Sequence, residues 1–209
     1  MIEARPERIL VFRLGSIGDL AAFSFYPTKN LGAIGDGGAV VTQFDAVADR
    51  IRSLREYGWR GDRVSHIPGM NSRLDELQAA ILRAKLPHLD ADNGRRRAIA
   101  DRYDAALAGL VEVPVRRRAD EHVFHLYVVR VADRDGVVAR LRECGVGAAV
   151  HYPLAAHQQP AYAGRLAGSA ELPETGRAVT EILTLPIYPE LSDAEVDAVI
   201  AAVKEAAGG

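Results

Sequence analysis

The segment AFSFYPTKNLG at residues 22–32, followed by GDGGA at residues 35–39, carries the most structural information in this chain. Residues 21–26 form a short apolar run that predicts a buried strand, which the following proline ends because it lacks an amide hydrogen. The glycines of the second stretch predict a turn, and residues 39–42 predict another strand. Lys29 is therefore expected between two strands.

Lys29 has unusual neighbours for a lysine. Lysine rarely lies in apolar surroundings without a partner or a task. Its amine can condense with an aldehyde, and burial favours the neutral, nucleophilic form. Ser24, five residues earlier, offers a hydroxyl donor to a phosphate. A phosphate-binding glycine loop is disfavoured, because Lys29 precedes the glycines and no helix is expected directly after them. A surface lysine in a loop is the alternative.

Helical patterns follow the second strand. Apolar residues recur at helical spacing over residues 45–57 and again over residues 75–86. Pro87 interrupts the second pattern, after which a long helix is expected to resume to about Leu107. Residues 58–72, rich in glycine, arginine, serine and asparagine, predict a long ordered loop. Loops of this length within compact domains are usually functional or disordered.

The last third of the chain alternates between strand and helix patterns. Four elements are expected there: strands at residues 123–131 and 147–151, and helices at residues 135–143 and 173–183. Ser192 and Glu195 form a capping-box pattern that opens a terminal helix to about Ala206.

These patterns predict an α/β protein with two domains. Residues 15–110 are expected to form one domain, which carries Lys29, and residues 111–209 a small α/β domain. Residues 1–14 are an atypical N-terminal segment, in which residues 9–12 predict a short buried strand.

Composition excludes several classes of function. The chain has 209 residues, of which 48% are hydrophobic and 26% charged, and a formal net charge of -2. This balance gives no electrostatic reason to expect nucleic-acid binding. No apolar run approaches the ~20 residues needed to cross a bilayer, and the N-terminus is too charged for a signal peptide. A single cysteine, Cys144, fits a reducing compartment. We expect a cytoplasmic protein that binds neither nucleic acid, membrane nor metal.

The amino-acid sequence around Lys29 closely resembles the cofactor-lysine motif of the DegT/DnrJ-type sugar aminotransferases, which use pyridoxal 5'-phosphate (PLP). Further similar motifs follow in the family's order: LREYG at 54–58, GMNSRLDELQAA at 69–80, HYP at 151–153, QPAY at 159–162 and LPIYP at 185–189. The resemblance extends from about Gly15 to the C-terminus. It is nearest to members that aminate 3-keto-6-deoxy sugars on a nucleotide carrier. It implies the C-terminal part of a fold-type-I large domain, followed by the small domain.

The resemblance implies a role for each matching residue. Lys29 would be the Schiff-base lysine and would carry the proton between substrate and cofactor, while the cofactor acts as electron sink. Ser24 would bind the cofactor phosphate, and Asn71 would reach across a dimer interface to the phosphate of the neighbouring subunit. Asn71 could instead be a turn or helix-capping residue. His151 and Tyr152 would face the sugar, or else be satisfied polar residues at a strand end.

The resemblance also implies that a part of the site is missing. Family members are about twice as long, and their N-terminal half supplies the carboxylate at the cofactor's ring nitrogen and a stacking aromatic residue. Asp19 lies too close to the strand before Lys29 to be assigned that role. We expect a nucleotide-linked keto-sugar as substrate and glutamate as amino donor. We also expect a homodimer or a complementary N-terminal half as partner, and little activity from this chain alone.

Two other functions remain open at this stage. One is a non-catalytic regulatory or interaction protein derived from the same fold. The other rests on residues 8–20, RILVFRLGSIGDL, which resemble the opening strand and glycine loop of heptosyltransferase-type glycosyltransferases. That second resemblance covers about thirteen residues, and nothing after Leu20 supports a glycosyltransferase.

Overall fold

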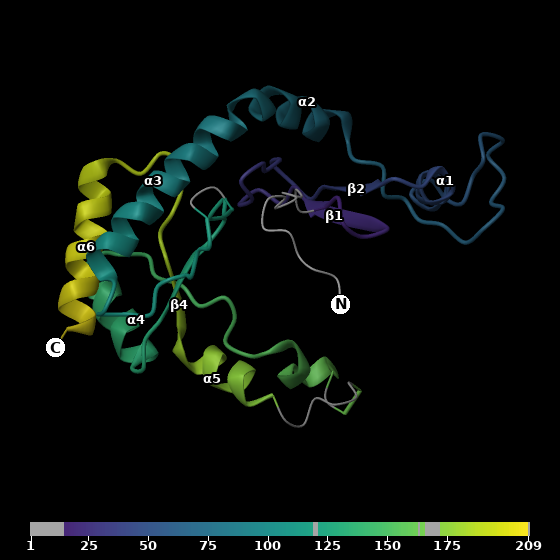
Figure 1. Ribbon diagram of the computed structural model, residues 1–209. Helices are drawn as coiled ribbons and strands as arrows, with labels where there is room; N and C mark the ends of the chain where they lie inside the picture. The colour runs from purple at the N-terminus through teal and green to yellow at the C-terminus, as the bar shows by residue number, and fades with distance from the viewer. Residues whose placement is uncertain (1–14, 119–120, 163, 166–171, 209) are drawn as a thin grey trace, which may run out of the picture. The chain divides into compact units, whose positions relative to one another are not determined.

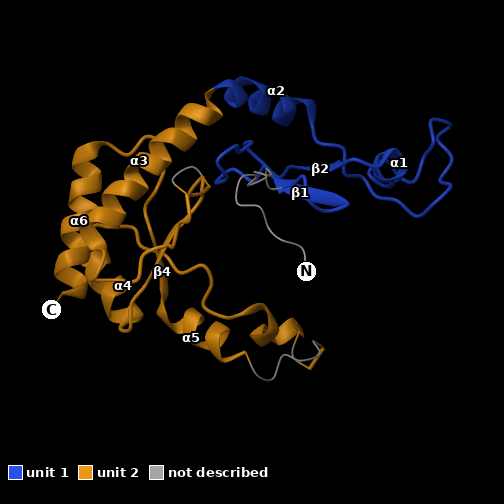
Figure 2. Cartoon of the chain, in the orientation of Figure 1, with its two compact units in different colours: residues 1–87 blue, residues 88–209 orange. Residues whose placement is uncertain are grey.

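The structure is a computed structural model that describes residues 15–118, 121–162, 164–165 and 172–208. The strand predicted at residues 9–12 lies outside these residues. The chain forms two compact units, residues 1–87 and residues 88–209 (Figure 2). Each unit is described by itself.

Unit 1 begins with an antiparallel hairpin. Strand β1 (Leu20–Ser24) pairs with strand β2 (Gly38–Thr42), in a register that sets Leu20 opposite Thr42 and Ser24 opposite Gly38 (Figure 1). Both strands are therefore present, but the first ends at Ser24 rather than at Tyr26. Most of its residues are exposed, so the expectation of a buried strand is wrong. The predicted glycine turn belongs to a longer connection, residues 25–37, which contains Lys29.

Two helices follow the hairpin. Helix α1 (Asp45–Leu54) packs against β2, and helix α2 (Glu76–Lys85) leads into a short 3₁₀ turn, η1 (Leu86–His88), at the predicted proline break. Helix α1 ends before the predicted residue 57. Tyr57 and Gly58 have φ angles of 56° and 80°, which are incompatible with a continuing right-handed helix.

Unit 1 leaves much apolar surface exposed. Phe23 on β1 is 44% exposed, and its neighbours Val40 and Val41 on β2 are 44% and 43% exposed. Among the described residues of this unit, the buried apolar side chains are Ala33 and Leu82. An apolar hairpin normally packs against another layer of structure, so the surface of unit 1 has the character of an interface.

Unit 2 has an extensive core of its own. Strand β3 (Tyr127–Arg130) pairs antiparallel with strand β4 (Ile182–Leu185). Helix α6 (Asp193–Ala207) contacts both α3 (Leu89–Leu107) and α4 (Arg134–Glu143), and α4 also contacts β4 (Figure 1). Helix α5 (Pro173–Glu181) and the 3₁₀ turns η2 (Ala156–Gln158) and η3 (Pro160–Tyr162) complete the unit. The largest fully buried side chains are those of Tyr103, Tyr127, Phe124, Ile99, Leu107, Leu141, Leu183 and Leu185.

The capping box predicted for the terminal helix is confirmed. The hydroxyl oxygen of Ser192 accepts a hydrogen bond from the amide of Glu195 at 3.2 Å. The carboxylate of Glu195 accepts one from the amide of Ser192 at 2.8 Å. Two amide groups at the helix start are thus satisfied reciprocally.

Three predictions for unit 2 are corrected by the structure. The helix expected over residues 173–183 ends at Glu181, because the next four residues pair with β3 as strand β4. The strand expected at residues 147–151 is reduced to one isolated bridge between Ala149 and Thr184. The strand expected from residue 123 begins only at Tyr127, after Phe124 adopts a φ of 45°.

The domain boundary near residue 111 stays a prediction, although α3 packs within unit 2. In the part of the chain that the structure describes, no helix is both long and apolar enough to span a membrane.

Candidate functional site

Lys29 lies in a closed turn directly after β1. The amide of Lys29 donates to the carbonyl oxygen of Tyr26 at 2.8 Å, and the amide of Ala33 donates to the carbonyl oxygen of Phe25 at 2.8 Å. A Cβ atom at Gly32 would lie 2.4 Å from the carbonyl oxygen of Pro27, so only glycine allows this close approach. The backbone around the lysine is therefore tightly defined.

Helix α2 supports the same turn from outside. The ammonium group of Lys85 donates to the carbonyl oxygen of Gly32 at 2.8 Å. The side-chain oxygen of Gln78 accepts a hydrogen bond from the amide of Ile34 at 2.9 Å. These long-range bonds stabilise the turn through side chains that are 44 and 53 residues away in sequence.

Ser24 and Lys29 are brought to the same end of the hairpin. Lys29 is half-buried, whereas Ser24 is exposed at the last position of β1. The hydroxyl oxygen of Ser24 accepts a hydrogen bond from the amide of Tyr26 at 3.2 Å. Its hydroxyl hydrogen remains a donor, since a serine hydroxyl both accepts and donates. A primary amine and a hydroxyl donor suit the aldehyde and the phosphate of PLP, so the residues present fit this cofactor.

Asp19 is poorly placed to complete that site. It precedes β1, and its carbonyl oxygen accepts from the hydroxyl group of Thr42 at 2.6 Å. Lys29 lies beyond the opposite end of the strand. The five steps from Asp19 to Ser24, at about 3.3 Å each, span roughly 17 Å. This geometry agrees with leaving Asp19 out of the ring-nitrogen role.

Asn71 lies in the predicted long loop, residues 58–72, which has neither helix nor extended strand. The backbone of Asn71 forms an isolated bridge with Glu56, and its side-chain oxygen accepts from Arg73 Nε at 3.1 Å. The residue is exposed. Asp75 occupies the N-cap position of α2, so Asn71 does not cap that helix.

The same loop and the residues at its two ends form contacts that the sequence did not indicate. The rings of Tyr57 and Trp59 lie 4.9 Å apart, and the Arg73 guanidinium lies 5.8 Å from the Tyr57 ring centre. The His66 imidazole contacts the Asp62 carboxylate at 2.6 Å. This contact lowers the pKa of Asp62 to about 2, with a smaller contribution from the amide of Val64. Its four-residue spacing was the only sequence signal for the pair.

His151 and Tyr152 lie in unit 2. His151 is half-buried, and its Nδ1 atom is 2.9 Å from the hydroxyl oxygen of Thr184 on β4. Tyr152 is 68% exposed, and the rings of the two residues are 5.5 Å apart and nearly perpendicular. The contact with Thr184 was not anticipated from the sequence.

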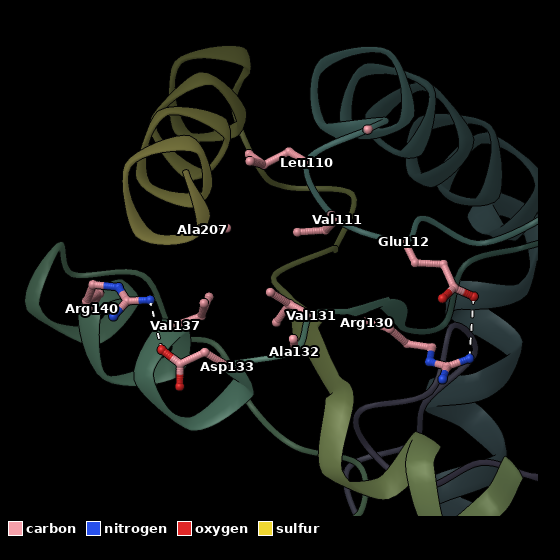
Figure 3. Close-up of a pocket in the computed structure, with 11 residues that line it drawn as sticks. Leu110, Val111, Glu112, Arg130, Val131, Ala132, Asp133, Val137, Arg140 and Ala207 are labelled. Carbon is pink, nitrogen blue, oxygen red and sulfur yellow. Dashed lines mark hydrogen bonds and ion pairs between the residues drawn. The ribbon is translucent and has the colours of Figure 1, made fainter. Parts of the chain in front are cut away.

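A hollow of about 610 Å³ in unit 2 is separate from these residues (Figure 3). It is lined by residues 109–112, residues 130–133, Val137, Arg140 and Ala207. Its charged groups are already paired: Arg140 with Asp133 at 3.3 Å and Arg130 with Glu112 at 3.4 Å. None of the site residues predicted from the sequence lines it.

The turn around Lys29 presents a primary amine in the same segment as the hydroxyl group of Ser24, and these are the groups that a lysine-dependent aldehyde cofactor requires. The DegT/DnrJ/EryC1/StrS aminotransferase family matches residues 12–204 of this chain. The chain therefore belongs to this family of PLP-dependent sugar aminotransferases.

Individual relatives agree with this assignment. The dTDP-3-amino-3,4,6-trideoxy-alpha-D-glucose transaminase of Streptomyces venezuelae is 46% identical over 195 residues, covering 92% of this chain and 52% of that protein. A protein of Geobacillus stearothermophilus named pleiotropic regulatory protein is 41% identical over 196 residues, covering 92% of this chain and 53% of that protein. The chain spans about half the length of the curated relatives it matches.

Solved structures give the same result. DesV from S. venezuelae, in complex with a ketimine intermediate, matches with a TM-score of 0.88 at 46% identity, covering 94% of this chain and 54% of that chain. The ntda protein from Bacillus subtilis, with bound cofactor PMP, matches with a TM-score of 0.85 at 32% identity. The match covers 94% of this chain and 47% of that chain. The mixed α/β fold is thus confirmed over about half of these proteins.

Proposed function

We propose that this chain supplies the lysine-bearing, C-terminal half of a PLP-dependent aminotransferase that acts on nucleotide-linked keto-sugars. The observation that carries the proposal is the turn after β1, which contains Lys29 five residues after Ser24 and whose backbone is anchored by Lys85. In this proposal the chain corresponds to the last part of a fold-type-I large domain followed by the small domain. By analogy with the transaminases it matches, we expect a 3-keto-6-deoxy sugar on a nucleotide carrier as substrate and glutamate as amino donor.

Each residue has a defined task in this proposal. Bound PLP would supply the electron sink that stabilises negative charge at the substrate carbon. The Lys29 amine would hold the cofactor covalently and, once released, would carry the proton between the substrate carbon and the cofactor carbon. The Ser24 hydroxyl donates to the phosphate. Asn71 donates to the phosphate of a neighbouring subunit, and His151 and Tyr152 orient the sugar.

The proposal requires a second polypeptide surface. A ring-nitrogen carboxylate is needed to give the cofactor its full electron-sink character, and Asp19 is not placed to provide it. The exposed apolar side chains of the β1–β2 hairpin favour association with a homodimer partner or a complementary N-terminal half. We therefore expect little turnover from this chain alone. Sedimentation analysis should show association, and a well-behaved monomer would argue against this part of the proposal.

Covalent trapping tests the role of Lys29. The chain has two other lysines, Lys85 and Lys204, which serve as internal controls. After incubation with PLP and reduction by borohydride, peptide mass mapping should place the adduct predominantly on Lys29. Lys29→Ala should lose the imine absorbance, whereas Lys204→Ala should retain it. Equal labelling of all three lysines, even with a complementary N-terminal half present, would contradict the proposal.

A non-catalytic regulatory role is the second candidate, favoured by the name of the Geobacillus stearothermophilus relative. A coupled amination assay separates the two functions. The chain would be combined with an N-terminal half taken from a full-length relative, then supplied with a nucleotide-linked keto-sugar and glutamate. Lys29-dependent turnover supports the aminotransferase. Cofactor binding without turnover in the reconstituted enzyme supports the regulatory role.

A further inference from the structure

Thr184 is a buried polar residue in an apolar strand. Strand β4 reads ILTL, and its side chains alternate between the two faces of the sheet. Leu183 and Leu185 belong to the main core of unit 2, so Thr184 points to the opposite face. Thr184 is nevertheless only 6% exposed. A buried hydroxyl group requires a hydrogen-bond partner.

The backbone register brings that partner to Thr184. The amide of Thr184 donates to the carbonyl oxygen of Ala149 at 2.7 Å, and the amide of Ala149 donates back at 3.1 Å. His151 follows Ala149 by two residues, and residues two apart in an extended segment share a face. The imidazole therefore reaches the Thr184 hydroxyl diagonally, with a distance of 2.9 Å from Nδ1 to Oγ1.

We infer that Thr184 is a positioning residue that orients the His151 ring and leaves Nε2 as the nitrogen available to a sugar hydroxyl or carbonyl group. A neutral imidazole has one donor nitrogen and one acceptor nitrogen. The Thr184 hydroxyl group can donate to Nδ1 or accept from it. In either case the bond occupies Nδ1, and Nε2 takes the complementary role of the neutral ring. The inference rests on the proposed sugar-facing role of His151, and it names the residue that holds the imidazole ring in position for that contact.

Nitrogen NMR of the histidine rings tests this inference on the chain without any ligand. His151→Gln identifies the resonances of His151. Thr184→Val keeps the shape of the side chain but removes the hydroxyl group, so the Nδ1 resonance of His151 should shift and the proton should redistribute between the ring nitrogens. Thr184→Ser should retain the wild-type ring signals. The resonances of His157, in the same unit, should be unchanged in both variants.

Unchanged His151 signals in Thr184→Val would overturn the inference. If that variant does not fold, the wild-type protein still provides a test. The hydroxyl proton of Thr184 should exchange slowly and show a nuclear Overhauser effect to the His151 ring. A rapidly exchanging hydroxyl proton would also contradict the inference. Neither measurement depends on PLP or on turnover. Failure here is therefore distinguishable from failure of the proposed function, which the trapping experiment on Lys29 decides.

Discussion

The ammonium group of Lys85 donates a 2.8 Å hydrogen bond to the carbonyl oxygen of Gly32. This bond joins the last turn of helix α2 to the segment that carries Lys29, although the two residues are 53 positions apart. Gly32 is buried, and a carbonyl oxygen in such a position must be satisfied. One lysine of the chain thus helps to hold the backbone around another.

Replacing Lys85 should loosen the turn around Lys29. Lys85→Met keeps the apolar stem but removes the donor, at a cost of roughly 1 kcal/mol. The amide of Ala33, which is bonded across the turn to Phe25, should then exchange its hydrogen about fivefold faster. Hydrogen–deuterium exchange with peptide-level mass spectrometry measures this change. Arg83→Met removes a cation from the same helix on a different face, and equal acceleration in that control would contradict the prediction.

Alanine substitutions at Gly32 and at Gly176 should change stability in opposite directions. At Gly32 a Cβ atom would lie 2.4 Å from the carbonyl oxygen of Pro27, so Gly32→Ala must displace backbone and should destabilise unit 1 by about 1–3 kcal/mol. At Gly176, within α5, a Cβ atom meets nothing within 4 Å. Gly176→Ala should stabilise that helix by about 0.5–1 kcal/mol.

Different probes follow the two glycine substitutions. Trp59, the chain's single tryptophan, reports unfolding of unit 1 through its fluorescence. Far-ultraviolet circular dichroism reports all helices, and most of the described helical residues lie in unit 2. Gly32→Ala should also reduce trapping of PLP on Lys29. A Gly32→Ala protein with unchanged tryptophan unfolding and unchanged trapping would show that the turn does not need the close backbone approach.

Local signals made unit 1 predictable from the sequence. Pro27 lies shortly after the end of β1, and glycines lead into β2. Ser24 and Lys29 belong to one local segment because only five residues separate them. The capping box of Ser192 was readable for the same reason, since both of its partners lie within one helical turn.

Nonlocal pairing accounts for what the sequence did not predict. The four residues of β4 continue the apolar spacing of α5, and so short a run cannot be assigned to helix or strand by periodicity. Pairing with β3 makes these four residues a strand. The contact between Thr184 and His151 spans 33 residues and depends on that pairing. It could not be foreseen while residues 173–183 were expected to be one helix.

Arg96 should be a major contributor to the stability of unit 2. The residue is 6% exposed, and its Nη1 atom donates to the carbonyl oxygens of Phe124 at 3.1 Å and Ile187 at 2.8 Å. Burial lowers the pKa of Arg96, while the carboxylates of Glu190 and Asp92 oppose that shift.

Removing the Arg96 guanidinium would leave both carbonyl groups without this donor. Arg96→Met should therefore lower the free energy of unfolding of unit 2 by about 2–4 kcal/mol. Urea unfolding followed by circular dichroism measures the loss. Arg142→Met, at an exposed position on α4, is the matched control and should change little. A fall no larger than in that control would mean that the buried guanidinium is dispensable.

The Asp62–His66 contact predicts how the long loop of unit 1 responds to acid. The hydrogen bond from His66, assisted by the amide of Val64, lowers the pKa of Asp62 to about 2 from the ordinary value of 3.8. A carboxyl group whose pKa is depressed by folding stabilises the fold above its ordinary pKa. That contribution is lost as the pH falls from 3.8 towards 2.

Removing the imidazole should reverse most of this shift. In His66→Ala the pKa of Asp62 should rise towards 3.8, and only the part due to the amide of Val64 should persist. Carbon NMR of the carboxyl groups measures the midpoint of Asp62 in both proteins. Because the contact joins two exposed side chains, added salt should also weaken it. If the Asp62 midpoint stays near 2 in His66→Ala, backbone hydrogen bonding rather than the imidazole holds the carboxylate in its charged form.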